Sequence, residues 1–280
     1  MVDSQYTPDI PKLYHYKLQR VLGEGGTGKV YLGIDMNKGA PVAIKLFHEN
    51  FFRNRLHVRD LAKSIIKFKR FKHNNVVQIL DFIDDTQGRC LVMEYVDGPS
   101  LKWYLLNRPY RLNERINIAL QICQGMQYLH DKGCIHHDFK PSNVLFTRTG
   151  IVKIADFSLY GNTFLLELID RNVGEQITPM FVAPEFIRKE KVTNQSDIYS
   201  MGITFYMLFT DKVPFPVDSL KRLYQCHLTI MPEHPSLANP ACPNTLGDII
   251  MKMIAKRPEL RFNDCDELSV AITQMSRSRI

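Results

Sequence analysis

Asp138, Lys140 and Asn143 lie within six positions of one segment and carry three side chains that in-line phosphoryl transfer needs. A carboxylate can accept the proton of the attacking hydroxyl, and a lysine can stabilise the charge on the moving phosphoryl group. An asparagine oxygen can bind magnesium, and a further carboxylate, Asp156, follows a predicted strand and would hold the metal that bridges the phosphates. The sequence therefore predicts a phosphoryl-transfer loop at 135–143.

A glycine-rich segment near the N-terminus gives a second chemical signal. Its glycines include Gly23, Gly25 and Gly28. Glycine lets backbone amides approach phosphate oxygens with no side chain in the way. The segment comes within one residue of a P-loop, with Val30 where that motif has its magnesium-binding hydroxyl. A P-loop opens a helix, whereas this chain continues as a strand and leads to Lys45, which could reach the phosphates of a nucleotide.

The pattern of strands and helices that must position these residues predicts an α+β fold. Residues 16–47 alternate apolar and polar positions between glycines, as a strand meander does. A helical period at 53–72 and strand patterns at 76–82 and 89–95 precede a break at 97–99. Beyond the break we expect helices at 112–131, 195–209, 218–226 and 246–254, short strands near Val144 and Val152, and a proline-rich loop at 232–243. We accordingly expect an N-terminal extension at 1–15, a small lobe at 16–96 and a larger helical lobe at 97–275.

The ordered set of motifs resembles the eukaryotic-like serine/threonine protein kinases over about residues 16–270. The sequences at 140–143 and 196–200 are similar to those of bacterial members. Lys140 and Thr178 are residue types that resemble those of the serine/threonine branch at these positions. The resemblance implies a two-lobed kinase fold, with a small antiparallel-sheet N-lobe containing one main helix and a larger, mainly helical C-lobe. We expect a chain trimmed close to the catalytic domain.

The resemblance also implies a role for each matched residue. Asp138 would be the catalytic base, Lys140 its partner, and Lys45 the phosphate-anchoring lysine, while Asn143 and Asp156 would bind Mg2+. The residues expected to contact ATP are Leu22, Gly23, Gly25, Gly28, Val30, Ala43, Lys45, Glu94, Val96 and Leu145, with Met93 as gatekeeper. Residues 178–185 would be the substrate-side end of the activation segment, 196–202 the helix that supports the catalytic loop, and Glu185 and Arg261 a buried ion pair.

Three departures from the family pattern bear on regulation. Ser158 replaces the glycine that follows Asp-Phe, which restricts backbone rotation there. His137 replaces an arginine that grips a phosphorylated loop, and a neutral histidine should grip it weakly. Ser64 stands where the family has the glutamate that pairs with the lysine, although Asp60 lies one turn earlier and could substitute for it. The apolar stretch 164–169 is either a short helix packed on the C-lobe or a segment that packs against the Ser64 helix.

Composition narrows the class of protein further. The 280 residues include 45% hydrophobic and 23% charged residues, no apolar leader and no stretch near the roughly 18 apolar residues of a membrane span. Six scattered cysteines suit reduced thiols in a cytoplasmic protein. The net charge of +7 is spread widely, so we do not expect a nucleic-acid partner. Basic residues are densest at 53–72, where we favour a solvated helix face over a docking site for a regulatory protein.

Taken together, these residues predict an active serine/threonine kinase that uses ATP and Mg2+ and acts on protein hydroxyls. The alternative is a pseudokinase that binds nucleotide and works as an interaction module, because Ser64 removes a partner of Lys45. A P-loop NTPase explains neither the segment at 135–143 nor the Ala-Pro-Glu at 183–185.

Overall fold

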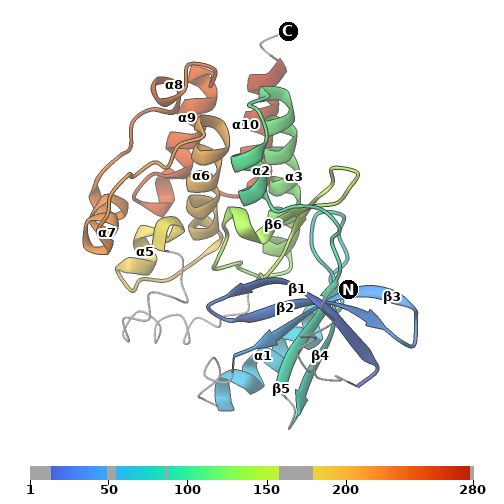
Figure 1. Cartoon of the computed structure of the whole chain (residues 1–280). Helices are drawn as coiled ribbons and strands as arrows, with labels where there is room; N and C mark the ends of the chain where they lie inside the picture. The colour runs from blue at the N-terminus through green and yellow to red at the C-terminus, as the bar shows by residue number, and fades with distance from the viewer. Residues whose placement is uncertain (1–13, 49–54, 86–87, 158–178, 278–280) are drawn as a thin grey trace. The chain divides into compact units, whose positions relative to one another are not determined.

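The computed structural model describes residues 14–48, 55–85, 88–157 and 179–277 (Figure 1). The chain divides into two compact units. The first unit contains Met1–Lys72 and Val77–Val96, and the second contains His73–Val76 and Asp97–Ile280.

The first unit is built on a five-stranded antiparallel sheet with the strand order β1-β2-β3-β5-β4. Its strands are β1 (Tyr16–Gly25), β2 (Gly28–Asp35), β3 (Ala40–Phe47), β4 (Ile79–Asp85) and β5 (Gly88–Glu94). Alternate residues of these strands, including Leu18, Ile44 and Val92, form one buried cluster. This alternation is the period-two pattern from which the meander was predicted, and that prediction is confirmed.

One helix, α1 (Arg55–Phe68), packs against β4. Leu61, Ile65 and Phe68 lie on one face at helical spacing and are buried. Burial of side chains of this size stabilises the unit by about 2 kcal/mol each. The outward face carries the exposed Lys63 and Ile66, in agreement with a solvated helix face.

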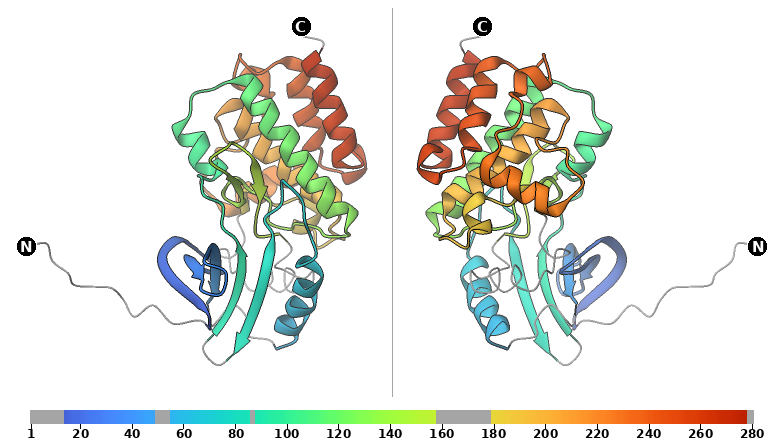
Figure 2. Two further views of the ribbon diagram at one scale, coloured as in Figure 1. Left: turned by 90° about the vertical axis from the view of Figure 1, so that its right-hand side faces the viewer. Right: turned by 90° about the vertical axis from the view of Figure 1, so that its left-hand side faces the viewer.

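The second unit is mainly helical. Its helices are α2 (Leu101–Asn107), α3 (Leu112–Asp131), α5 (Pro184–Ile187), α6 (Asn194–Thr210), α7 (Leu220–Thr229), α8 (Pro235–Ala238), α9 (Asn244–Met253) and α10 (Cys265–Arg277). A two-stranded sheet joins β6 (Val144–Phe146) and β7 (Val152–Ile154). The long helix α3 contacts α6, α10 and β7, and the views in Figure 2 show α10 beside it. Short 3-10 turns lie at η1 (Pro141–Asn143), η2 (Pro179–Phe181) and η3 (Pro258–Leu260).

Four helices of the second unit were not predicted, and one of them is the four-residue α5 in the expected end of the activation segment. The helix α2 has only seven residues, which is too short to show a clear helical period of apolar positions. Its exposed Trp103 and Leu106 obscure that period further. The helix α8 interrupts the segment 232–243 that was predicted as a loop. It begins with a proline at its first turn and with the His234 side chain accepting from the Ser236 backbone, both of which favour a helix start. The last helix, α10, lies within the C-lobe range without having been assigned.

Residues His73–Val76 belong to the second unit, although they fall inside the range 16–96 expected for the first lobe. The side-chain amide of Asn75 donates to the Gln121 side chain at 3.1 Å and to the Val152 carbonyl at 2.9 Å. Val76 pairs with Ile154 in a parallel bridge. For this reason β4 begins at Ile79 and not at 76, as the strand pattern had predicted.

All six cysteine side chains are buried. Across the described residues, no helix has both the length and the apolar composition that a membrane crossing requires.

Candidate active site

The segment after α3 brings the predicted transfer residues together. The Lys140 ammonium lies 2.6 Å from Oδ2 of Asp138. The Asn143 side-chain amide donates to the backbone carbonyl of Asp138 at 2.9 Å and to its Oδ2 at 3.3 Å. Both side chains of the ion pair are largely sheltered, with 18% and 14% of their surface exposed. The carboxylate is therefore held in one orientation by two donors.

The Asp197 side chain of α6 holds the backbone of the segment 135–143 in place. Its two carboxylate oxygens accept the backbone amides of His136 and His137 at 2.7 and 3.0 Å. One of them also contacts Nε2 of His130 at 2.8 Å. Burial pushes the pKa of Asp197 upward, but the hydrogen bond from His130 and the neighbouring histidines outweigh it and hold the pKa below its usual value. The predicted support of this segment by the helix around 196–202 is thus visible as specific hydrogen bonds.

His137 occupies an unusual backbone conformation, with φ of 69°. This left-handed conformation is unfavourable for a residue other than glycine. The hydrogen bond from the His137 amide to Asp197 helps to stabilise it. Its ring nitrogen Nδ1 is buried and has no hydrogen-bond partner among the described residues. Burial, with the nearby His136, lowers the pKa of His137 despite the opposing charge of Asp197. The side chain is therefore neutral at pH 7.

Asp156 follows the short sheet and lies close to the transfer segment. The amide of Ala155 donates to the Asn143 carbonyl at 2.8 Å, which ties the residue before Asp156 to the other predicted metal ligand. The charges of Asp138 and Asp156 both act to raise the pKa of His136, although burial lowers it overall. Nε2 of His136 in turn contacts the Ala155 carbonyl at 3.1 Å. Within the second unit the charges of the two acidic residues therefore act on one buried histidine.

In the first unit, the glycine segment forms the β1–β2 turn. A Cβ at Gly28 would meet the Leu46 carbonyl oxygen at 2.2 Å, and the φ of 156° there is one that other residues rarely adopt. A Cβ at Gly23 or Gly25 would meet nothing within 4 Å. The fold of the sheet thus requires Gly28, whereas Gly23 and Gly25 leave open space beside the backbone, as a phosphate-binding turn needs.

The sheet also places most of the other residues expected to contact nucleotide. Val30 pairs with Lys45 across β2 and β3, and Ala43 pairs with Met93 across β3 and β5. Glu94 ends β5 and its carboxylate accepts the Gln78 amide at 3.1 Å. Leu22 and Val96 lie in the first unit, and Leu145 lies on β6 of the second.

The pairing expected between Asp60 and Lys45, and the expectations for the segment 158–178, concern residues or side chains outside the described part. Ser64 lies half-buried on α1, but the side chain of Asp60 is not among those described. Ser158, the stretch 164–169 and Thr178 lie in 158–178, outside the described residues.

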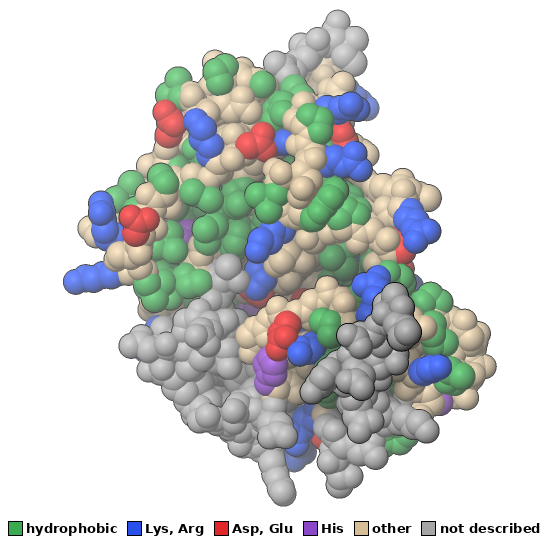
Figure 3. Space-filling view, in the orientation of Figure 1, with side chains coloured by type: hydrophobic (Ala, Val, Ile, Leu, Met, Phe, Trp, Pro, Cys, Tyr) green, Lys and Arg blue, Asp and Glu red, His purple; other side chains and the backbone are tan. Residues whose placement is uncertain are grey.

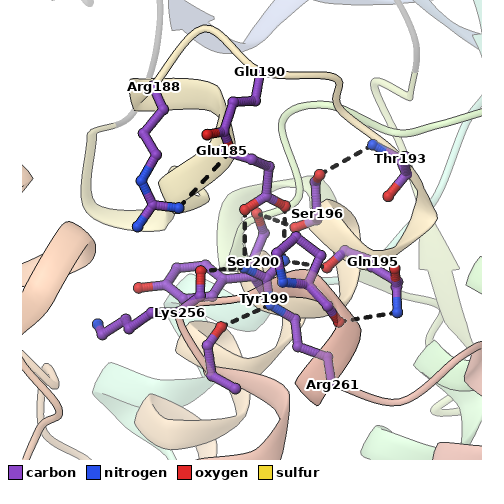
Figure 4. Close-up of polar contacts among 12 residues, drawn as sticks. Glu185, Arg188, Glu190, Thr193, Gln195, Ser196, Tyr199, Ser200, Lys256 and Arg261 are labelled. Carbon is purple, nitrogen blue, oxygen red and sulfur yellow. Dashed lines mark hydrogen bonds and ion pairs between the residues drawn. The ribbon is translucent and has the colours of Figure 1, made fainter.

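The expected ion pair between Glu185 and Arg261 is present and buried. The guanidinium donates to both carboxylate oxygens at 2.7 and 2.9 Å, with 0% and 1% of the two side chains exposed (Figure 4). Arg261 also donates to the carbonyls of Gln195 and Ala255. Although burial opposes it, the arginine lowers the pKa of Glu185.

Sequence reasoning missed His130 and His227, which are buried partners of α6. His130 lies on a helix whose apolar pattern masks a polar contact, and His227 contacts Tyr199 across 28 positions of sequence. No local pattern distinguishes such a histidine from one that merely packs in a core.

Comparison with known proteins gives consistent matches. The family model of the protein kinase domain matches residues 16–273. Serine/threonine-protein kinase PrkC of Bacillus subtilis is 30% identical over 259 residues, covering 92% of this chain and 40% of its own length. The probable serine/threonine-protein kinase PknB of Lactococcus lactis is 32% identical over 262 residues, covering 90% of this chain and 40% of its own. The chain thus spans about two fifths of the length of these relatives.

Solved structures agree on the fold. The PknI kinase domain of Mycobacterium tuberculosis superimposes with a TM-score of 0.76 at 22% identity, covering 94% of this chain and 97% of that one. Rad53 in complex with AMP-PNP superimposes with a TM-score of 0.75 at 23% identity, covering 91% and 64%. At this level of identity the likeness concerns the fold alone.

Proposed function

The chain belongs to the protein kinase domain family, and from this premise we propose that it transfers the γ-phosphoryl group of ATP to serine and threonine hydroxyls of proteins. The observation that carries the proposal is the close arrangement of Asp138, Lys140 and Asn143. The names of the relatives, which are serine/threonine kinases, support the same acceptor class.

Asp138 would accept the proton of the acceptor hydroxyl. Its Oδ2 accepts from both Lys140 and Asn143, whereas its Oδ1 has no hydrogen-bond donor among the described residues and is suited to a hydroxyl. Lys140, already 2.6 Å from the carboxylate, would stabilise negative charge on the transferred group. In the first unit, Lys45 would anchor the phosphates, and Gly23 and Gly25 would offer backbone amides.

The donor set fits magnesium. Nδ2 of Asn143 donates to Asp138, and Oδ1, which accepts the Ser142 hydroxyl at 3.4 Å, keeps a lone pair for a cation. Asp156 would add a carboxylate oxygen. Within the described ranges, no group of three or more His, Cys, Asp or Glu side chains could hold a metal by itself. Two protein oxygens suit an ion that also binds phosphates and water, as Mg2+ does in phosphoryl transfer. When bound, MgATP supplies the phosphoryl group and the charge neutralisation.

We also propose a cytoplasmic location, a protein acceptor and no nucleic-acid partner. Burial of all six cysteines supports a protein that keeps reduced thiols. On the face shown in Figure 3, Lys and Arg side chains are scattered, with Asp and Glu among them. On that face the described side chains form no basic cluster of the kind by which nucleic acid is usually bound. A regulatory protein at residues 53–72 remains the alternative to a solvated helix face.

A transfer assay tests the function. The protein is incubated with labelled ATP, Mg2+ and dephosphorylated casein, beside an Asp138→Asn control and a sample with excess chelator. We expect label on casein serine and threonine only in the first sample. Nucleotide binding without transfer in any sample would instead favour the pseudokinase.

Activity should not depend on phosphorylation of hydroxyl groups in the segment between Asp156 and Glu185. The neutral, buried His137 cannot give a phosphate the permanent charge of an arginine. Phosphatase treatment should therefore change the transfer rate by less than about twofold. A tenfold loss, restored by rephosphorylation at one site in that segment, would contradict this expectation.

Ser64→Glu should raise kcat/KM for ATP about tenfold if a carboxylate at position 64 orients Lys45 for the phosphates, since an oriented charge contact contributes about 1.4 kcal/mol. Ser64→Gln, of equal size without charge, is the matched control and should gain little. Asp60→Ala should then be nearly silent. If Asp60→Ala abolishes transfer and Ser64→Glu gains nothing, Asp60 has taken over the pairing.

A further inference from the structure

The short turn η2 is only weakly held by its own backbone. The hydrogen bond that closes it, from the Val182 amide to the Pro179 carbonyl, is 3.4 Å long. Backbone hydrogen bonds in proteins are usually about 2.7–3.2 Å long. Phe181, the last residue of η2, packs in a buried cluster with Tyr199 and Ile203 of α6. The shape of the turn must therefore come largely from its contacts with α6.

Ser200 of α6 adds a polar contact to this packing. Its hydroxyl donates to the Phe181 carbonyl at 2.7 Å, a normal length for an O–H donor. The Ser196 carbonyl, one turn earlier on the same helix, is farther from the hydroxyl, at 3.3 Å. A serine inside a helix commonly bonds the carbonyl four positions earlier. Because a hydroxyl has one proton, Ser200 directs it along the shorter contact, out of the helix and to the turn.

Both partners of this hydrogen bond are buried. Among the described residues, no other donor reaches the Phe181 carbonyl. A buried carbonyl that loses its donor costs more free energy than the hydrogen bond itself contributes. Without the Ser200 hydroxyl, the backbone at Phe181 would therefore have to move to find another partner.

The chain that follows η2 is anchored separately. Glu185, four positions after Phe181, forms the buried ion pair with Arg261, and Figure 4 shows Ser200 near this pair. The Phe186 and Ile187 amides donate to the Ala183 carbonyl at 3.1 and 3.3 Å as α5 begins. Loss of the Ser200 hydroxyl should therefore loosen 180–183 and leave α5 in place.

We propose that Ser200 is a positioning residue, whose hydroxyl holds the Phe181 carbonyl and thereby keeps 179–182 in the shape that receives the acceptor protein. The inference rests on the proposed function, because the acceptor role of this segment follows from the kinase assignment. A serine kept only for packing would be replaceable by alanine without effect on acceptor binding, since alanine has the higher helix propensity and needs no partner.

Three variants separate the two roles. Ser200→Ala removes the hydroxyl, whereas Ser200→Thr keeps one. Thr204→Val is the matched control, because Thr204 lies one turn later on α6, is fully buried, and has a hydroxyl with no hydrogen-bond partner among the described residues. We expect Ser200→Ala to raise KM for casein about tenfold with KM for ATP within twofold. Ser200→Thr should recover most of the difference, and Thr204→Val should leave both KM values unchanged.

Hydrogen–deuterium exchange gives a readout that does not need activity. The Val182 amide, which is bonded to the Pro179 carbonyl, should exchange about tenfold faster in Ser200→Ala than in the parent or in Thr204→Val. The amides of Phe186 and Ile187 in α5 should exchange at the parental rate, because the Glu185 pair still holds them.

Three results overturn the inference. The first is equal exchange at 180–183 in Ser200→Ala and Thr204→Val. The second is faster exchange that extends to α5, because the hydroxyl would then stabilise the whole unit and not this turn. The third is faster exchange with an unchanged KM for casein in an active parent. A parent without transfer activity overturns the proposed function and the acceptor role, while the exchange still decides whether Ser200 holds the segment.

Discussion

Asp138→Asn should lower the rate of phosphoryl transfer about a thousandfold while ATP affinity changes only a few-fold. A positioned general base contributes about 10²–10⁴ in rate, and the amide has no basic oxygen with which to take the hydroxyl proton. The substitution keeps the size of the side chain, so Asn143 and Lys140 still meet an oxygen at that position. Single-turnover rates with labelled ATP and casein, beside calorimetric binding of MgATP, measure both effects.

Asp131→Asn is the matched control for this variant. Asp131 ends α3 on the exposed surface, where its carboxylate accepts from Gln127 at 2.8 Å. It should retain the parental rate within about twofold, as an exposed contact contributes little. Comparable turnover of Asp138→Asn and the parent would remove Asp138 from its assigned role, and a loss of ATP binding would indicate damage to the nucleotide site instead.

Arg261→Ala should destabilise the second unit by about 3–5 kcal/mol. Removing one partner of a buried ion pair leaves the other charge buried and uncompensated, which costs far more than the pair itself contributes. Glu185 would be left in that state, and the arginine's bonds to the Gln195 and Ala255 carbonyls would be lost as well. The only tryptophan, Trp103, lies in the second unit, so its fluorescence during urea unfolding follows that unit.

Arg257, four positions before Arg261, offers a matched control for Arg261→Ala. Arg257 pairs with Glu259 on the surface, with 69% and 57% of the side chains exposed, and Arg257→Ala should leave the urea midpoint nearly unchanged. The double variant Arg261→Met with Glu185→Gln should be less destabilised than the sum of its single changes, because no unpaired charge remains. A midpoint for Arg261→Ala equal to that of Arg257→Ala would show that the buried pair contributes little.

The same pair predicts a pH dependence. The pKa of Glu185 is lowered in the folded protein, so its contribution is present above the ordinary glutamate pKa and is lost as pH falls through the lower, folded value. His227, whose pKa is about 4 when folded, acts in the same direction below its ordinary value of 6.5. Both groups should therefore make the second unit less stable in acid.

The sequence alone predicted the transfer residues because they are close together along the chain. Asp138, Lys140 and Asn143 occupy one turn-rich segment whose residue types and order carry the signal. The Glu185–Arg261 pair was also anticipated, through resemblance and not through spacing, since 76 positions separate the two. Strands of the first unit were predicted from alternation, although β3 and β5 bury consecutive residues, at 42–45 and 90–93, and so have both faces covered there.

Contacts between distant segments were not predictable in this way. The pairing of Val76 with Ile154 moved the start of β4, because a strand's partner is chosen by tertiary contact and not by local propensity. The bond between Tyr199 and His227 likewise joins two helices with no shared motif. Short helices such as α8 were missed because a proline-rich segment ordinarily indicates a loop.

The place of His73–Val76 in the second unit constrains how the two units can be exchanged between relatives. A chimera joined at Val96 would replace four residues of the second unit, two of them buried, together with the first unit. Gln121 and the Val152 carbonyl would then depend on a foreign residue at position 75. The backbone of that residue also lies close to Gly125, where an added Cβ would meet the Asn75 carbonyl at 2.7 Å. Breakpoints that keep 73–76 with 97–277 preserve these contacts. The unit that can be transplanted is therefore assembled from two separate stretches of the gene.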